Sequence, residues 1–113
     1  MEPLYVIIHG KITSIEQELR RIQNKPLDLL ESIISELQKI RDEQTFIDLP
    51  LSFLPRNIPY DPKDKNIFLC GAYGDIFVAS HLKFLEEYGI PAQIYKSATL
   101  FTRDSILCTK REY

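Results

Sequence analysis

The residues best suited to chemistry are a cysteine and a histidine, each at the end of an apolar run. Cys70 ends the run that begins at Ile67, and His9 follows the run Leu4–Ile8. A thiol becomes a strong nucleophile when a nearby histidine takes its proton. If the two runs are neighbouring strands, Cys70 and His9 predict a small cysteine hydrolase or transferase. The simpler interpretation is that Cys70 is an inert, buried thiol, because free cysteine packs like a small hydrophobe.

The turn that follows Cys70 is a second candidate site. Its residues are Gly71, Ala72, Tyr73, Gly74 and Asp75. The first amides of a helix that starts here could bind a small anion or line an oxyanion hole. Because the turn matches neither a P-loop nor a G-x-G-x-x-G fingerprint, nucleotide or anion binding is an alternative rather than the leading hypothesis. The simpler role of Asp75 is to cap the helix.

Composition argues against several other classes of function. The 113-residue chain has a net charge of −2 at pH 7 and scattered basic residues, so we expect no nucleic-acid partner. The two cysteines and two histidines show no paired ligand spacing, so we expect neither a metal nor a cofactor. The first apolar run is too short for a signal peptide or a membrane span. Two cysteines in a domain of this size favour free thiols and a cytoplasmic location.

The clearest structural signal is a strand, turn, helix and strand between residues 65 and 95. The run Ile67–Cys70 is apolar at every position, which is typical of a strand buried on both faces of a parallel sheet. A helix is predicted over 75–88, with Gly89 as the left-handed residue that ends it. A second strand follows at Ala92–Tyr95. The segment therefore predicts a βαβ unit with a right-handed crossover.

The remaining elements alternate in the same way. We expect strands at Leu4–Ile8 and Thr45–Leu49, helices at 14–24 and 26–41, a proline-rich loop at 50–62, and a C-terminal β-hairpin or edge strands at Thr99–Thr109. This order predicts one α/β domain over residues 1–113, a Rossmann-like fold with a mostly parallel sheet of four to six strands covered by helices.

Such a sheet tells us where a ligand would bind. In open α/β sheets, ligands lie beyond the carboxyl ends of the strands. His9, Asp48 and Cys70 are predicted at strand ends, and Lys96 directly follows the predicted last strand of the unit. We therefore expect these side chains and the 71–75 turn to share one edge of the sheet, with Lys96 as the cation for an anionic ligand.

Two segments could instead bind another copy of the chain. The helical segment 27–40 is strongly amphipathic, and the proline-rich loop carries apolar residues between its prolines. The simpler interpretation is that this helix covers the sheet. The alternative is that it forms the seam of a coiled-coil dimer. The leading hypothesis is a non-catalytic binding or assembly protein that forms a dimer or a larger oligomer.

The stretch from Ile67 onward also resembles the isochorismatase/nicotinamidase-like cysteine hydrolases. The matching features are an apolar strand that ends in Gly71, the acidic residue Asp75, and Phe77-Val78 at the start of a helix that ends before Gly89. The resemblance covers about a third of the chain and implies an α/β sandwich that oligomerises. It also implies that the thiol chemistry of that superfamily is absent.

Three departures from the superfamily lead to that last implication. Phe77 stands where members of the superfamily have their catalytic cysteine, and His9 stands where they have an aspartate after the first strand. No residue of this chain matches their catalytic lysine. Phenylalanine cannot act as a nucleophile, so the resemblance implies a shared fold without the shared reaction.

Overall fold

The protein folds as a parallel sheet between two helices. The structure is a computed structural model and describes residues 2–8, 27–50 and 58–101. In chain order its elements are β1 (Glu2–Ile8), α2 (Leu27–Glu43), β2 (Phe46–Leu49), β3 (Lys65–Ala72), the π-helical turn η1 (Gly74–Val78), α3 (Ala79–Glu87) and β4 (Ala92–Leu100). Within these residues the sheet has four strands, all parallel, in the order β2-β1-β3-β4. The predicted α/β class and Rossmann-like architecture are confirmed.

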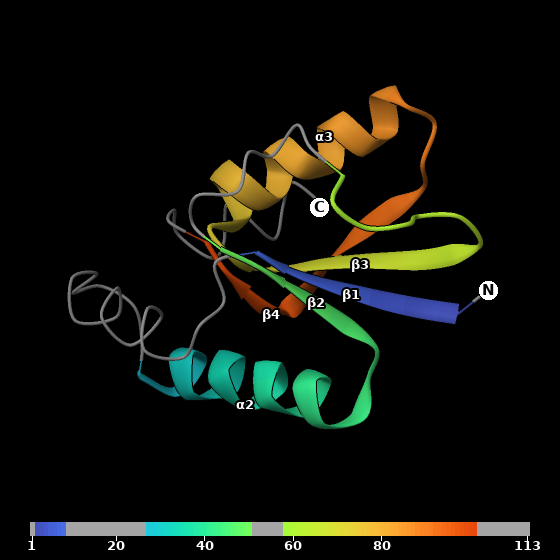
Figure 1. The fold of residues 1–113 in the computed structure, drawn as a ribbon. Coiled ribbons are helices and arrows are strands. Elements are labelled where there is room, and N and C mark those ends of the chain that lie inside the picture. The colour runs from blue at the N-terminus through green and yellow to red at the C-terminus, as the bar shows by residue number, and fades with distance from the viewer. Residues whose placement is uncertain (1, 9–26, 51–57, 102–113) are drawn as a thin grey trace.

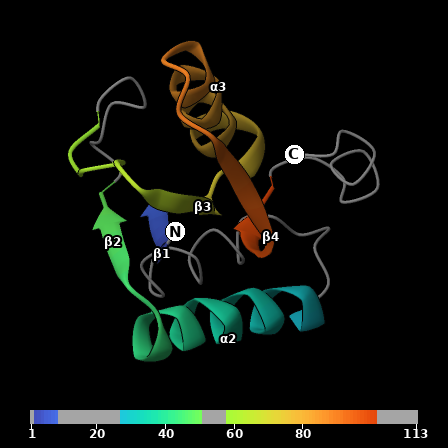
Figure 2. The same ribbon diagram turned by 90° about the vertical axis from the view of Figure 1, so that its right-hand side faces the viewer.

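The order of the strands creates a switch point in the middle of the sheet. The chain leaves β1 through α2 to reach β2 on one side, and it leaves β3 through α3 to reach β4 on the other side. The two helices lie on opposite faces of the sheet (Figures 1 and 2). Parallel sheets need cover on both faces, which explains the apolar runs of the two central strands.

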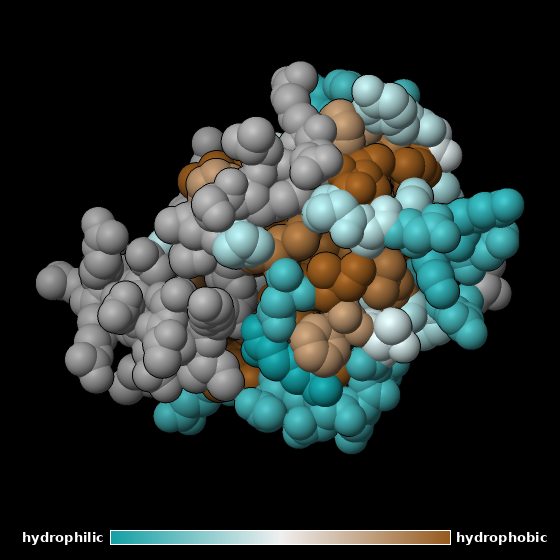
Figure 3. Space-filling view, in the orientation of Figure 1, coloured by the Kyte–Doolittle hydropathy of each residue, from teal (hydrophilic) through white to brown (hydrophobic). Residues whose placement is uncertain are grey.

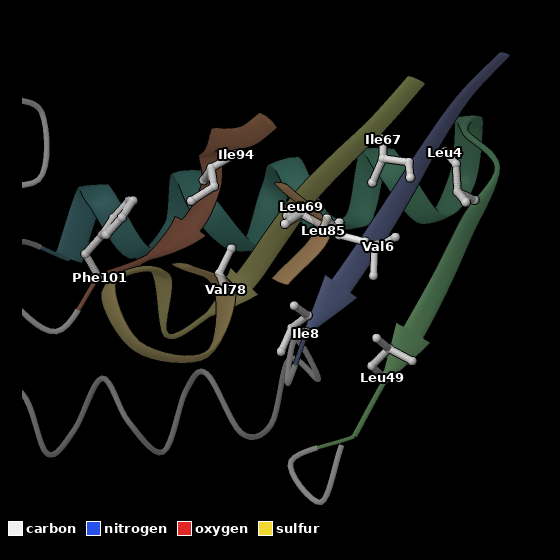
Figure 4. Close-up of a cluster of buried hydrophobic side chains, with 10 residues drawn as sticks. All are labelled: Leu4, Val6, Ile8, Leu49, Ile67, Leu69, Val78, Leu85, Ile94 and Phe101. Carbon is white, nitrogen blue, oxygen red and sulfur yellow. The ribbon is translucent and has the colours of Figure 1, made fainter. Parts of the chain in front are cut away.

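Each face of the sheet has its own core. On the α3 face, alternate residues of the central strands pack with Val78 and Leu85; Figure 4 shows this cluster, which comprises Leu4, Val6, Ile8, Leu49, Ile67, Leu69, Val78, Leu85, Ile94 and Phe101. On the α2 face, Ile33, Leu37 and Ile40 pack against the sheet. Between residues 31 and 40 the apolar stripe of α2 is therefore buried within the fold, which confirms the interpretation that this helix covers the sheet.

The end of α3 also agrees with the prediction. Gly89 has a φ of +71°, its amide donates to the Glu86 carbonyl, and the amide of Ile90 donates to the Leu85 carbonyl. These two bonds form a Schellman motif, which satisfies the last carbonyl groups of the helix. The start of the helix differs from the prediction. The helical stretch begins at Gly74 after Tyr73, so Asp75 lies inside its first turn and is not the N-cap.

The last described strand is longer than predicted. The prediction ended it at Tyr95, but β4 continues to Leu100, so Lys96 lies within the strand and not beyond its end. The cause is a bulge: Leu69 pairs with Ile94 and Gly71 pairs with Thr99, so four residues of β4 stand opposite Cys70 alone. The predicted helix 14–24, residues 51–57 of the proline-rich loop and most of the C-terminal hairpin lie outside the described residues.

No described helix is both long and apolar enough to cross a bilayer.

Candidate functional site

The carboxyl edge of the central strands is where this fold would place a ligand. The switch point lies between β1 and β3, where Ile7 is in register with Cys70 and Ile8 with Gly71. The strands that carry Cys70 and precede His9 are therefore neighbours, which is the condition set by the thiol hypothesis. His9 itself lies outside the described residues, so a Cys70–His9 pair stays a prediction.

Cys70 is a core residue in this structure. Its side chain is fully buried on the α2 face, together with Ile7, Ile33 and Leu37. Its Sγ donates a long hydrogen bond of 3.8 Å to the Val6 carbonyl on β1. Burial raises the pKa of the Cys70 thiol to about 12; the positive charge of Arg41 opposes this shift, and the negative charge of Asp48 adds to it. A reactive thiolate needs a lowered pKa and access to solvent, and Cys70 has neither.

The turn glycines are fixed by packing. An ideal Cβ on Gly71, whose φ is +104°, would lie 2.1 Å from the Ile8 carbonyl oxygen. An ideal Cβ on Gly74 would lie 2.4 Å from the Phe101 ring and 2.6 Å from Cγ2 of Thr99. Both positions therefore require glycine so that neighbouring groups can approach. Close approach by the protein itself accounts for both glycines without a bound ligand.

The amides of the turn are partly used inside it. The Tyr73 carbonyl accepts hydrogen bonds from the amides of Ile76, at 3.1 Å, and Val78, at 3.0 Å. An anion at this helix start could not receive those two amides without breaking the turn. Tyr73 is half-buried and packs beside the core on the α2 face. Ala72 is buried in that core.

The two charged residues expected at the same edge are separated from the turn. Asp48 points to the α2 face, where its carboxylate accepts from Nη2 of Arg41 at 2.8 Å and from Nε at 3.4 Å. Lys96 is exposed within β4, at the bulge. The structure therefore brings Asp48 to Arg41, and it places Lys96 four residues before the carboxyl end of β4.

Sequence reasoning did not find a buried tyrosine–histidine pair. His81 on α3 is fully buried, and its Nε2 lies 2.5 Å from the hydroxyl of Tyr60 in the loop before β3. Burial raises the pKa of Tyr60, so its hydroxyl stays protonated; the tautomer of the imidazole sets which of the two groups donates. The two residues are 21 positions apart, and only the helical position of His81 indicated that it would pack.

A second unpredicted link joins α2 to β4. The Tyr95 hydroxyl donates to the Glu36 carboxylate at 2.9 Å, which raises the pKa of Tyr95 together with its burial. Tyr5 stacks on Phe68 with ring centres 5.0 Å apart and meets Tyr95 edge-on at 5.7 Å. The hydrogen bond to Glu36 joins α2 to β4, and the aromatic contacts join β1, β3 and β4 on the same face of the sheet.

A surface groove lies along α2 and is not lined by any residue of the predicted site. It has a volume of about 510 Å³, is open to solvent and follows the outer side of α2, where it is lined by Glu31, Ile34, Ser35, Gln38, Lys39 and Asp42. Among the residues that the structure describes, no three acidic, cysteine or histidine side chains gather to hold a metal.

Comparisons with known proteins give no relative to this chain. No protein-family model, no curated protein and no solved structure matches it.

Proposed function

We propose that this protein is a small, non-catalytic α/β protein that binds or assembles through its surface, and that its first partner is a second copy of itself. The observation that supports this proposal best is the state of Cys70. Its thiol has no exposed surface, and burial raises its pKa to about 12. The residue best suited to act as a nucleophile is therefore packed in the core.

The self-association in this proposal is supported by the edge of the sheet at β2. It is not supported by the helical segment 27–40 or by the proline-rich loop. The buried apolar side chains of α2, which are Ile33, Leu37 and Ile40, already pack against the sheet. The described end of the proline-rich loop packs inward, because Ile58 and Tyr60 are half-buried against the core on the α3 face. The edge strand β2 carries the half-buried apolar side chains Phe46 and Ile47, and Figure 3 shows a brown, hydrophobic area in the middle of the visible face. A net charge of only −2 offers little repulsion between copies.

The other two hypotheses have weaker support. A Cys70 enzyme would need the core to open before the thiol could reach a substrate. An anion site at the 71–75 turn would compete with the bonds to the Tyr73 carbonyl, and Lys96 would have to act from within β4. The resemblance to isochorismatase-like proteins stays a proposal about ancestry. In it, Phe77 occupies the nucleophile position and is half-buried against the core on the α3 face.

Light scattering coupled to size-exclusion chromatography tests this function. The mass should rise above the 13.2 kDa of one chain as the loading concentration is increased. A mass that stays at one chain at every concentration would contradict self-association. Turnover that is lost in Cys70→Ser and kept in Cys108→Ser would contradict the non-catalytic part of the proposal.

A further inference from the structure

β2 is an edge strand whose outward backbone groups can be identified. The Tyr5 amide donates to the Thr45 carbonyl at 3.0 Å, and Tyr5 is in register with Phe46. In a parallel ladder, backbone groups of alternate residues point to the same neighbour. The groups of Thr45 and Ile47 therefore point to β1. The amide and carbonyl groups of Phe46 and Asp48 point away from the sheet.

The side chains beside this edge are suited to contact with another protein. Phe46 is half-buried next to the core on the α2 face, and Ile47 is half-buried next to the core on the α3 face. Asp48 is 44% exposed and is held by Arg41. Apolar side chains thus flank both faces of the row of outward-pointing backbone groups.

The opposite edge of the sheet is protected. The bulge after Ile94 interrupts β4, and exposed Lys96 lies inside it. Bulges and charged residues, lysine above all, are two devices by which natural sheets prevent edge-to-edge pairing. β2 carries neither a bulge in its pairing with β1 nor a lysine, and its only charged side chain is already paired. Of the two edges of the sheet that the described residues form, β2 is therefore the one that lacks these devices.

We propose that β2 pairs antiparallel with β2 of a second copy across a two-fold axis, which joins two sheets into one of eight strands. This proposal rests on the self-association proposed above and names its interface. Phe46 of each copy would lie opposite Asp48 of the other, and these pairs exchange four backbone hydrogen bonds. Ile47 would lie opposite Ile47 at the axis, on the α3 face.

Backbone direction and charge select this register over its neighbours. The outward residues at this edge are Gln44, Phe46 and Asp48, and the Gln44 amide already donates to the Ile40 carbonyl at 2.9 Å. A register with Phe46 opposite Phe46 would pair Asp48 with Gln44 and would need that amide, so it is unfavourable. A register with Asp48 opposite Asp48 would place like charges side by side, which is unfavourable. That register would also need an amide from Pro50, and proline has none. The register centred on Ile47 avoids these costs.

A proline substitution tests the hydrogen bonds without breaking the fold. Asp48→Pro removes an amide that points away from β1, and edge strands tolerate proline at such positions. Asp48→Asn is the matched control, because it removes the charge and keeps the amide. Sedimentation across a concentration series should show dimerisation weakened by about tenfold or more in Asp48→Pro and little changed in Asp48→Asn. Circular dichroism and thermal melting check that each variant is folded.

Amide hydrogen exchange of the unmodified protein gives a second, independent readout. Exchange at Phe46 and Asp48 should slow as concentration rises, while exchange at Ile47 and Leu49, whose amides point to β1, should not change. A chain that stays monomeric throughout overturns the self-association and this interface together. A dimer that forms equally well in Asp48→Pro, with no protection at the two outward amides, overturns the interface alone.

Discussion

Gly71, which the structure places within β3 and not in the predicted turn, should be very hard to replace. Its φ of +104° lies in the region that residues with a side chain rarely adopt. An added Cβ would stand 2.1 Å from the carbonyl oxygen, 2.8 Å from the nitrogen and 2.9 Å from the carbonyl carbon of Ile8. All three atoms belong to the backbone of the neighbouring central strand, so no side-chain rotation can relieve the contact.

The size of the effect follows from two separate costs. A left-handed conformation costs an alanine about 1–2 kcal/mol. Relieving a contact of 2.1 Å requires β1 and β3 to move apart by more than 1 Å, which disturbs close packing on both faces. We expect Gly71→Ala to lower the free energy of unfolding by about 4 kcal/mol or more. That is close to the whole stability of a small domain, which begins at about 5 kcal/mol.

Gly89 provides the matched control. Its φ is also positive, at +71°, but an added Cβ would meet no atom within 4 Å. Gly89→Ala should therefore cost only about 1 kcal/mol, because the conformational strain is partly offset by a less flexible unfolded chain. Urea unfolding followed by circular dichroism measures both variants. Equal losses of stability in the two variants would refute the inference that close approach of Ile8 is what requires glycine at position 71.

Three further predictions concern the cores. The thiol of Cys70 has a pKa of about 12 in the folded protein, against an ordinary value of 9.0. Its contribution to stability should therefore be intact below about pH 9 and should fall as the pH rises toward 12. In urea unfolding, the free energy of unfolding should fall less between about pH 7 and pH 10 in Cys70→Ala than in the unmodified chain. Tyr60→Phe should cost about 1–3 kcal/mol by removing the hydroxyl that hydrogen-bonds to buried His81. Tyr88→Phe, at a residue that is 67% exposed, should change stability by less than about 0.5 kcal/mol, and similar losses in the two variants would contradict the role of the Tyr60 hydroxyl. Leu37→Ala should cost about 2–5 kcal/mol in the same assay, because Leu37 is fully buried between α2 and the sheet, and a loss below 1 kcal/mol would show that α2 packs loosely.

The sequence was most informative where local rules and burial agree. The apolar runs of β1 and β3 are the two central strands, and Gly89 ends α3 with the bonds expected of a left-handed cap. The stripe of α2 was correctly interpreted as a cover for the sheet. In each case the signal lies within a few neighbouring residues, so no tertiary information is needed.

The failures occur where contacts between distant residues decide the structure. Lys96 and Ser97 looked like the end of a strand because they are polar, but β4 passes through them in a bulge and resumes pairing at Thr99. Asp75 has the residue type of an N-cap, yet the helix begins one residue earlier with a π-helical turn. Neither outcome follows from local propensity; at the helix start, Gly74 lies close against Phe101 and Thr99, two residues that are distant in the sequence.

The strands around the candidate site were easier to predict than the arrangement of its side chains. The neighbouring strands correctly place Cys70 near the carboxyl edge, but residue type alone does not reveal whether a thiol is buried. Asp48 was placed at a strand end, while its partner Arg41 comes from a helix that only the fold brings above it. The Tyr60–His81 pair joins a loop to a helix and has no signature in the sequence.

The most direct test of the central claim is the rate at which an alkylating reagent modifies Cys70. In a Cys108→Ser background, Cys70 is the only thiol of the chain. If Cys70 is core, alkylation at neutral pH should be very slow in the folded protein and should become fast only in urea, in step with unfolding. Rapid alkylation of the folded protein below pH 8 would contradict the claim, because it would show an exposed thiolate at the switch point of the sheet.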